Sequence, residues 1–435
     1  MRTQAIGNGS LRARIPAPFA AAMRALQLQG ADTAELSSLR NEEWRELLPM
    51  MDHAHLALPF AQQDLSGLPN WVGEHLGNNL VDTARHWERV RAAYREAAAA
   101  LDAYGVEYVV LKGFTQAPDF APRPELRWQG DIDFYVPREH IPAAVRALQE
   151  IEYASCHAEE DYRDADHVPT LVRFGAWKWN GNVYDPEVPP AVEVHFCLWN
   201  DSVYSIALPE IEEFWDRRRF RRLGDLTFPA LHPVDHLGYL ALHIVRGVFS
   251  AESPVHHVRE LATFLHGRAF DDAFWKEWTA MHSPRLRRMQ ALAFSLAAAW
   301  FSCNQHGAVK AEIDSLDPPL RSWIETCGGA PLENLFRRTR EGRLLQSLLA
   351  ESPEARRKIM ATALATGRIA RPAKVASFET HPSTTPARSN LISSYLEYPA
   401  YLLSRIWMNG TAILRLLAHA SLLHLPRRHT AWSED

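Results

Sequence analysis

The stretch EYVVLKGFTQAPDFAPRPELRWQGDIDFYV, from Glu107 to Val136, decides the fold of this chain. It holds two apolar runs typical of strands; the first ends in Leu-Lys-Gly at 111–113, and the second carries Asp131 and Asp133. A strand places residues i and i+2 on one face, so the two carboxylates point the same way while Ile132 points into a core. Two like charges side by side need a compensating cation. Hard oxygen ligands suit a divalent metal, and the stretch therefore predicts a metal site.

A third acidic position lies on another predicted strand further along the chain. The segment AVEVHFCL at 191–198 alternates apolar and polar residues, which is typical of a half-buried strand with Glu193 and His195 on its polar face. With Asp131 and Asp133, this glutamate gives three carboxylates that can hold one or two Mg²⁺ ions. Paired metals stabilise the attacking and leaving oxygens of an in-line phosphoryl displacement. His195 either orients a metal-bound group or is a half-buried histidine bonded to the backbone.

Length, charge and cysteine content narrow the class of protein. The 435 residues suffice for about two or three domains. A formal net charge of -5, from 47 basic and 52 acidic residues, gives no support for general nucleic-acid binding. Four cysteines without a CxxC pair indicate neither a zinc ribbon nor a disulfide framework, which favours a reducing, cytoplasmic location. The N-terminus is too weakly apolar for a secretory signal, and no run of about 18 charge-free apolar residues predicts a transmembrane segment.

The order of these motifs resembles the DNA polymerase β-type nucleotidyltransferase superfamily. Within it, the bacterial "LKG"-type nucleotidyltransferase family is the more similar group. The residues that carry the resemblance are Leu111-Lys112-Gly113, Arg127, Asp131-Ile132-Asp133 and Glu193-Val194-His195. Helical segments before and after the strands are also similar, so the resemblance extends over residues 35–300. It implies a mixed sheet flanked by helices, Mg²⁺ dependence, and nucleotidyl transfer from a nucleoside triphosphate (NTP) such as ATP.

We therefore expect an α+β fold, with a small mixed β-sheet nucleotidyltransferase core flanked by helices and a largely α-helical C-terminal domain. From residue 209 onward the pattern is almost wholly helical. The expected segments are a flexible N-terminus at 1–30, an N-terminal helical region at 31–105, the catalytic core at 106–225, a C-terminal helical domain at 226–365, a linker at 366–390, and an amphipathic helix and tail at 391–435. The last helix could lie on a membrane surface, dock onto the helical domain or form a partner interface.

The resemblance implies a role for each acid. Asp131 and Asp133 would bind both metals, and Glu193 would bind the catalytic metal and help to deprotonate the acceptor. Glutamate is one methylene longer than the aspartate usual at the third position, which moves its carboxylate.

The turn after the first strand departs from the Gly-Ser pair usual in the superfamily. Related toxin-type enzymes carry a Lys-Gly-Gly-Thr turn, so Lys112, Gly113 and Thr115 would hold the triphosphate, with the threonine supplying the hydroxyl. Phe114 in place of the second glycine narrows the room for phosphate. Arg127 would neutralise phosphate charge. The structural alternatives are an exposed strand-end lysine and an arginine paired with a nearby acid.

Two further groups of side chains have both a functional and a structural explanation. His236, His243 and the pair His256-His257 could suggest a metal site, but their spacing matches no HExxH pattern, which favours a polar helix end. Trp177 and Trp179 either line an acceptor pocket or pack against the sheet.

The expected reaction moves a nucleoside monophosphate from an NTP to a hydroxyl or phosphate acceptor and releases pyrophosphate, with Mg²⁺ at a two-metal site. A small molecule is the favoured acceptor, ahead of tRNA or protein. Two alternatives stay open. One is a catalytically silent nucleotide-binding or regulatory module, which the altered turn favours. The other is a toxin-type nucleotidyltransferase that acts on tRNA or protein.

Overall fold

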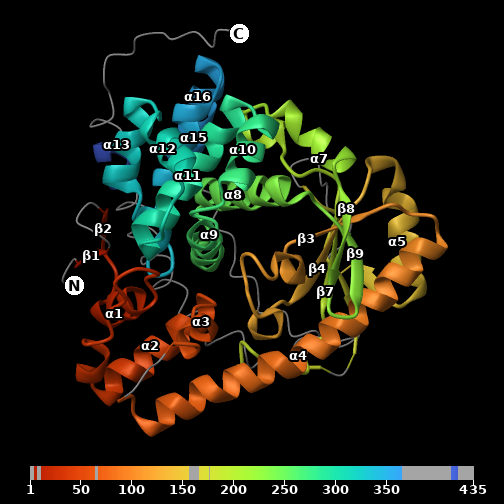
Figure 1. Cartoon of the computed structure of the whole chain (residues 1–435), viewed down its shortest axis with the longest axis horizontal. Helices are drawn as coiled ribbons and strands as arrows, with labels where there is room; N and C mark the ends of the chain where they lie inside the picture. The colour runs from red at the N-terminus through yellow and green to blue at the C-terminus, as the bar shows by residue number, and fades with distance from the viewer. Residues whose placement is uncertain are drawn as a thin grey trace, which may run out of the picture.

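A seven-stranded mixed sheet is the centre of the computed structural model, which describes residues 4–6, 11–63, 67–155, 166–175, 177–364 and 413–419. The spatial order of its strands is β5-β6-β7-β4-β3-β9-β8. Their bounds are β3 Val109–Leu111, β4 Asp131–Tyr135, β5 Tyr153–Ser155, β6 Leu171–Arg173, β7 Ala191–His195, β8 Arg219–Leu223 and β9 Leu226–Ala230. Helices flank this sheet (Figure 1), so the predicted α+β fold class is confirmed.

The middle of the sheet consists of the three strands predicted from the sequence. Strand β4 runs antiparallel to β3 and parallel to β7. In this register Asp133 lies opposite Leu111 on one side and opposite Glu193 on the other. Residues that lie opposite each other on neighbouring strands share a face, so Asp133 and Glu193 point to the same side of the sheet.

The apolar face of the sheet packs against two helices, α4 (Asn70–Ala103) and α5 (Ile141–Glu150). Ile132, Phe134 and Val192 on that face are fully buried among apolar side chains of both helices. Burial of one such side chain contributes about 1.5–3 kcal/mol. Because strand residues alternate between faces, this packing holds the acidic residues on the opposite face.

The N-terminal region differs from the flexible segment expected at 1–30. Helix α1 (Ala17–Ala25) is part of the core, and its residues Phe19 and Met23 are fully buried. The backbone N–H of Leu28 donates to the carbonyl of Phe301 at 2.8 Å, which ties this region to a distant helix. The alanine-rich run therefore packs through contacts with distant residues, which its local composition does not reveal.

Two more helices and a small hairpin complete the N-terminal region. The hairpin, β1 (Gln4–Ile6) with β2 (Leu11–Ala13), precedes α1. Helices α2 (Asn41–His53) and α3 (Ala57–Ala61) lie between α1 and α4. In Figure 1, α4 is the long helix that runs from these N-terminal helices to the sheet.

Most of the remaining described chain is helical. Its helices are α8 Pro233–Ser250, α9 Val255–Gly267, α10 Asp272–Met281, α11 Pro284–Phe301, α12 Gly307–Asp314, α13 Pro318–Cys327, α14 Ala330–Glu333, α15 Glu341–Leu349 and α16 Pro353–Leu364. Helices α8 and α9 lie between the rest of this helical body and the sheet in Figure 1. Across the described part of the chain, every helix is too short or too polar to cross a lipid bilayer.

The hairpin β8–β9 corrects the expectation that the chain is almost wholly helical from residue 209 onward. Its strands are joined by Gly224-Asp225, a two-residue connection of the kind that tight hairpins favour, and Gly224 has φ +58°. Ala230 of β9 pairs with Val110 of β3 in parallel register, which adds the hairpin to the sheet. Short helices α6 (Asp201–Tyr204) and α7 (Glu213–Asp216) precede it.

The predicted linker at 366–390 lies outside the described residues, as does most of the predicted amphipathic helix and tail at 391–435. Residues 413–419 of that helix are described and are helical. There, Leu416 is fully buried, and Arg415 forms ion pairs with two buried glutamates of the helical body. This short segment therefore packs on the helical body.

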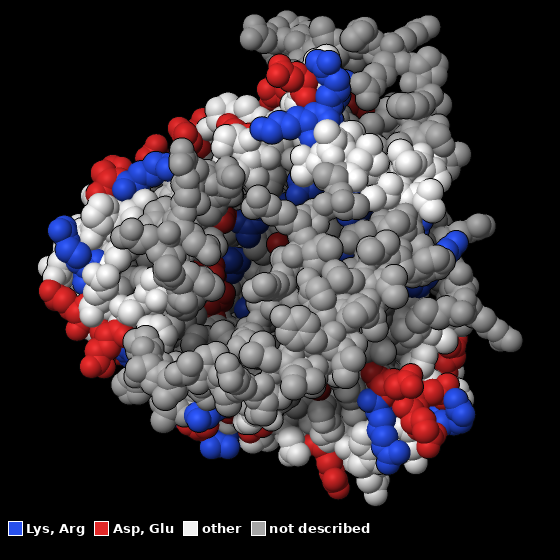
Figure 2. Space-filling view, turned by 180° about the vertical axis from the view of Figure 1, so that it is seen from behind, with Lys and Arg blue, Asp and Glu red and all other residues white. Residues whose placement is uncertain are grey.

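Charges of both signs are mixed on the face of the molecule shown in Figure 2. Among the described residues visible there, acidic and basic side chains alternate, and a hollow near the middle shows both signs side by side. The mixture agrees with the small formal net charge of -5.

Candidate active site

Asp133 is the centre of a polar cluster on the face of the sheet opposite α4. It is 1% exposed, and its Oδ1 atom lies 2.7 Å from Lys112 Nζ and 2.8 Å from His195 Nε2. An ionised carboxylate can only accept, so both nitrogens donate to it. Glu193 Oε2 lies 3.4 Å from the same imidazole nitrogen, and Oε1 accepts from the Thr170 hydroxyl at 3.0 Å. The predicted strand face is thus a network of acids, a lysine and a histidine.

The pKa shifts in this cluster follow from its contacts. Burial alone would raise the pKa of Asp133, but the Lys112 ammonium and the His195 hydrogen bond outweigh it and lower that pKa. Burial would lower the pKa of His195, but its hydrogen bonds to Asp133 and Glu193 raise it instead. Burial and the negative charge of Asp133 together raise the pKa of Asp131. Asp133 is therefore firmly ionised, whereas the neighbouring Asp131 ionises easily only when a cation lies beside it.

The turn after β3 has an unusual backbone. Lys112 and Gly113 have positive φ angles of +46° and +52°. A Cβ atom on Gly113 would lie 2.1 Å from Gln129 Nε2, so a larger residue fits there only if Gln129 moves. Gln129 accepts from the Phe114 backbone N–H at 2.9 Å and donates to the Asp131 carbonyl at 2.7 Å. The glutamine therefore fixes the turn against the strand that carries the aspartates.

Two residues of the turn lie elsewhere than the sequence suggested. Thr115 is 1% exposed, and its hydroxyl donates to the Lys112 carbonyl at 2.6 Å, so it closes the turn instead of facing a ligand. Phe114 does not reduce the room for phosphate. Its ring is buried against Tyr94 and Phe228, with centroid distances of 5.1 and 5.0 Å. Both positions follow from the way the turn folds back on the core.

Arg127 pairs with an acid that is distant in the sequence. Its Nε atom lies 2.6 Å from Oε1 of Glu260 on α9 and 3.1 Å from Oε1 of Gln116. The other oxygen of Glu260 lies 3.2 Å from His257 Nδ1. Arg127, which lies in the loop before β4, therefore connects this loop to helix α9.

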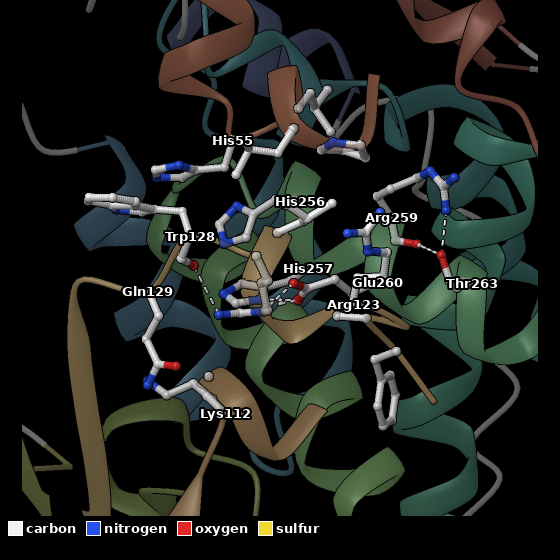
Figure 3. Close-up of a pocket in the computed structure, with 18 of the residues that line it drawn as sticks. His55, Lys112, Arg123, Trp128, Gln129, His256, His257, Arg259, Glu260 and Thr263 are labelled. Atoms are coloured by element: carbon white, nitrogen blue, oxygen red, sulfur yellow. Dashed lines mark hydrogen bonds and ion pairs between the residues drawn. The ribbon is translucent and has the colours of Figure 1, made fainter. Parts of the chain in front are cut away.

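A cavity of about 480 Å³ opens beside the cluster, between the sheet, α9 and the N-terminal helices. Its volume is within the range of small-molecule sites, roughly 300–1,000 Å³. The predicted site residues in its lining are Lys112, Gly113, Arg127, Asp131 and Asp133. Figure 3 shows the opposite wall, with His55, His256, His257, Arg259 and Glu260 around the open space. Thr115 and Glu193 are the predicted site residues that do not line it.

The histidine-rich helices do not form a second metal site within the described residues. The one described group with metal-ligand geometry is Asp133, Glu193 and His195, whose ligand atoms lie within 4.8 Å of one another. The rings of His256 and His257 pack with their centroids 3.9 Å apart. Burial lowers the pKa of both, which keeps them neutral. Within the described residues, His256 and His257 therefore belong to the cavity wall and not to a metal-ligand group.

The two tryptophans weighed as an acceptor pocket lie away from the cavity. Trp177 donates its indole N–H to Asp185 at 2.8 Å, and Trp179 is 50% exposed. Neither belongs to the lining. The structure therefore does not place either tryptophan in an acceptor pocket at this cavity.

Three polar residues lie around the cluster, and of these Asp166 was not found from the sequence. Arg246 on α8 forms an ion pair with Asp166, and its Nη2 atom lies 2.8 Å from His243 Nδ1. Asp166 Oδ2 lies 3.8 Å from Nδ1 of His195. No local motif marks these residues, because they meet only when α8 packs against the polar face of the sheet. The polar residues on the otherwise apolar α8 were the one available signal.

The donor set fits a hard divalent cation. Asp133 and Glu193 on adjacent strands, with Asp131 two residues from the first, offer carboxylate oxygens, the ligands that Mg²⁺ prefers. The raised pKa of Asp131 also indicates a cation site, because a cation beside this carboxylate would relieve the repulsion from Asp133. The Lys112 ammonium already lies 2.7 Å from Asp133, and the His195 imidazole donates to the same carboxylate.

Comparison with known proteins agrees with this geometry. The sequence model of one family, described as uncharacterised nucleotidyltransferase, matches residues 40–302, which is more than half of the chain. Comparisons with curated proteins and with solved structures find no match. The matched range includes the sheet, the acidic cluster and the helices that line the cavity. The chain therefore belongs to this family of uncharacterised nucleotidyltransferases.

Proposed function

We propose that the protein transfers a nucleoside monophosphate from an NTP to a hydroxyl or phosphate acceptor and releases pyrophosphate. The observation that carries this proposal is the position of Asp133. It lines the cavity, lies opposite Glu193 on the parallel neighbouring strand, and shares its strand face with Asp131. In a member of a nucleotidyltransferase family, such a group of acids beside a cavity supports phosphoryl-transfer chemistry.

The acidic residues would have separate roles in metal binding and proton transfer. Asp131, Asp133 and Glu193 would hold Mg²⁺, which when bound supplies positive charge to the reacting phosphate and the leaving pyrophosphate. Glu193 would accept the proton of the acceptor hydroxyl. The hydrogen bond from His195 lowers the pKa of Glu193 against the effect of burial, so the glutamate is ionised at neutral pH and can act as a base. His195 would keep Asp133 oriented through its 2.8 Å hydrogen bond.

The triphosphate would lie against the Lys112-Gly113 turn and Arg127. A lysine side chain is long and flexible, so its ammonium can move from Asp133 to a phosphate oxygen while the backbone stays in place. We assign Thr115 to the support of this turn, through its bond to the Lys112 carbonyl. The Leu-Lys-Gly sequence of the turn supports membership of the "LKG"-type subgroup.

The size of the cavity, about 480 Å³, supports a small acceptor over tRNA or protein. The test is label transfer. Purified protein is incubated with Mg²⁺, each α-³²P-labelled NTP in turn, and either a small-molecule or a macromolecular fraction of a cell extract. We expect labelled product and pyrophosphate with the small-molecule fraction, and neither with Asp133→Asn. Equal pyrophosphate release by wild type and Asp133→Asn would exclude the proposed site.

One observation favours a second function, that of a catalytically silent nucleotide-binding module. The Lys112 ammonium already occupies the position of a cation at Asp133. If it stays there, nucleotide would bind without Mg²⁺ and no pyrophosphate would form. Nucleotide binding that is unchanged by a chelator, together with absent turnover, would support this module over the enzyme.

A further inference from the structure

Arg259 on α9 lies in the cavity wall away from the acidic cluster. Figure 3 shows Arg259 and Thr263 on one side of the open space and Lys112 on the other. The Arg259 residue is only 9% exposed. A buried guanidinium in the lining of a cavity is a costly arrangement unless an anion compensates its charge.

Among the described residues, the contacts of Arg259 include no ion pair with a carboxylate. Its guanidinium donates to the Thr263 hydroxyl and lies 5.6 Å from the centroid of the Phe301 ring. Its Nε atom has no hydrogen-bond partner within the described residues. No described carboxylate forms an ion pair with it, and burial lowers its pKa to about 10.

The other arginine buried in this wall provides a contrast. Arg127 lies 2.6 Å from Glu260, and that glutamate is also in contact with His257. Glu260 directly follows Arg259 in the chain, yet its carboxylate pairs with Arg127. The wall therefore holds one neutralised arginine near the turn and one arginine, Arg259, that forms no ion pair with a carboxylate of the described residues.

We propose that Arg259, with Thr263, forms a subsite for an anionic group of the acceptor, a carboxylate or a phosphate. The guanidinium offers a planar set of donors that matches either group, and the adjacent hydroxyl adds a further polar contact. This inference rests on the proposed function, because it places the acceptor in the part of the cavity that the acids and the Lys112 turn leave free. The acceptor would then carry a negative charge in addition to the group that reacts.

Anion binding is measured on the full chain saturated with Mg²⁺ and an α,β-methylene NTP, so that the triphosphate end of the cavity is filled. Inorganic phosphate and acetate are titrated separately, followed by ³¹P and ¹³C NMR, to distinguish the two classes of anion. We expect one of them to bind wild-type protein, and Arg259→Met to weaken it by about tenfold or more. Arg146→Met, which removes an exposed arginine of α5, should leave anion binding unchanged.

Affinity for the methylene nucleotide separates this inference from the proposed function. Nucleotide affinity should be the same in Arg259→Met and wild type, because Arg259 is assigned to the acceptor. A tenfold loss of nucleotide affinity in Arg259→Met would make Arg259 a triphosphate ligand and overturn the inference. If wild type binds no nucleotide, the proposed function fails, and the anion titration on nucleotide-free protein still tests Arg259. If Arg259→Met does not fold, Arg259→Lys replaces it, with an expected loss of about threefold. Unchanged anion affinity in a folded variant, or no anion binding by wild type, contradicts the subsite.

Discussion

The ammonium nitrogen of Lys112 lies 2.7 Å from Oδ1 of Asp133, the most deeply buried acid of the cluster. This contact joins the turn after β3 to the acidic face of β4. The lysine lowers the pKa of the aspartate, and the aspartate raises the pKa of the lysine against the effect of burial. The same lysine is our proposed ligand of the triphosphate, so it has two competing partners.

This competition predicts opposite effects of Lys112→Met on two ligands. Removal of the ammonium frees Asp133, so Mg²⁺ alone should bind about three- to tenfold more tightly. The Mg²⁺ complex of an α,β-methylene NTP should bind about tenfold more weakly, because a phosphate contact is lost. Isothermal titration calorimetry measures both. The exposed Lys178→Met is the matched control, and effects of the same sign on both ligands would contradict the two-partner role.

A comparison of two glycines tests the packing of the turn. Gly113 and Gly105 both have positive φ, +52° and +63°, but only Gly113 has a neighbour where a Cβ would lie. Gln129, the neighbour, would have to move and break its two hydrogen bonds, each worth about 0.5–1.5 kcal/mol. We expect Gly105→Ala to destabilise the protein by about 1 kcal/mol and Gly113→Ala by about 3 kcal/mol, measured by urea unfolding. Equal losses would show that Gln129 does not constrain the turn.

The strands that carry the acids could be predicted because their alternation is local. In the segments that contain Asp133 and Glu193, each polar residue is followed by a buried apolar one, and the sheet preserves that pattern. The resemblance implied a mixed sheet, but the parallel register of these two strands was not predicted. The α+β class was predicted from the resemblance to nucleotidyltransferases.

Other parts of the site depend on contacts between residues far apart in the sequence. Nothing near Arg127 indicates that its partner is Glu260, 133 residues later. The hydroxyl of Thr115 was expected to face a ligand, but its bond to the Lys112 carbonyl depends on the positive φ of that lysine, which composition does not reveal. The hairpin β8–β9 was missed because its short polar strand, RFRRL, has little apolar content of its own.

A buried histidine predicts how stability depends on pH. Burial, with the charge of nearby Arg221, lowers the pKa of His236 from 6.5 to about 3. Between these values the unfolded chain binds the extra proton, so the contribution of His236 to stability is complete above pH 6.5 and is lost as the pH falls toward 3. His236→Phe, which keeps the ring beside Phe120, should reduce the loss of unfolding free energy between about pH 7.5 and 5 by about 2 kcal/mol.

Urea unfolding at each pH measures this slope. The exposed His53→Gln provides the control, because its slope should equal that of wild type. An unchanged slope in His236→Phe would mean that the histidine is protonated in the folded protein.

The ion pairs of Arg415 predict how firmly residues 413–419 are attached. Its Nη2 atom lies 3.0 Å from Glu333 and 3.1 Å from Glu341, and the side chain of Glu341 is fully buried. Arg415→Met would leave this buried charge poorly compensated, at a cost of about 3 kcal/mol in unfolding free energy. Arg357→Met, which removes an exposed arginine of α16, should change stability by less than about 0.5 kcal/mol. Equal small effects of the two substitutions would mean that the segment contributes little to stability.

The most direct test of the central claim is calorimetric titration of an α,β-methylene NTP into wild type, Asp133→Asn and the exposed control Asp102→Asn, each with and without Mg²⁺. If Asp133 holds the metal that binds the triphosphate, wild type and Asp102→Asn will bind the nucleotide only with Mg²⁺. Asp133→Asn will then bind it about a hundredfold more weakly. Nucleotide binding that is equally tight without Mg²⁺, or in Asp133→Asn, would contradict the account.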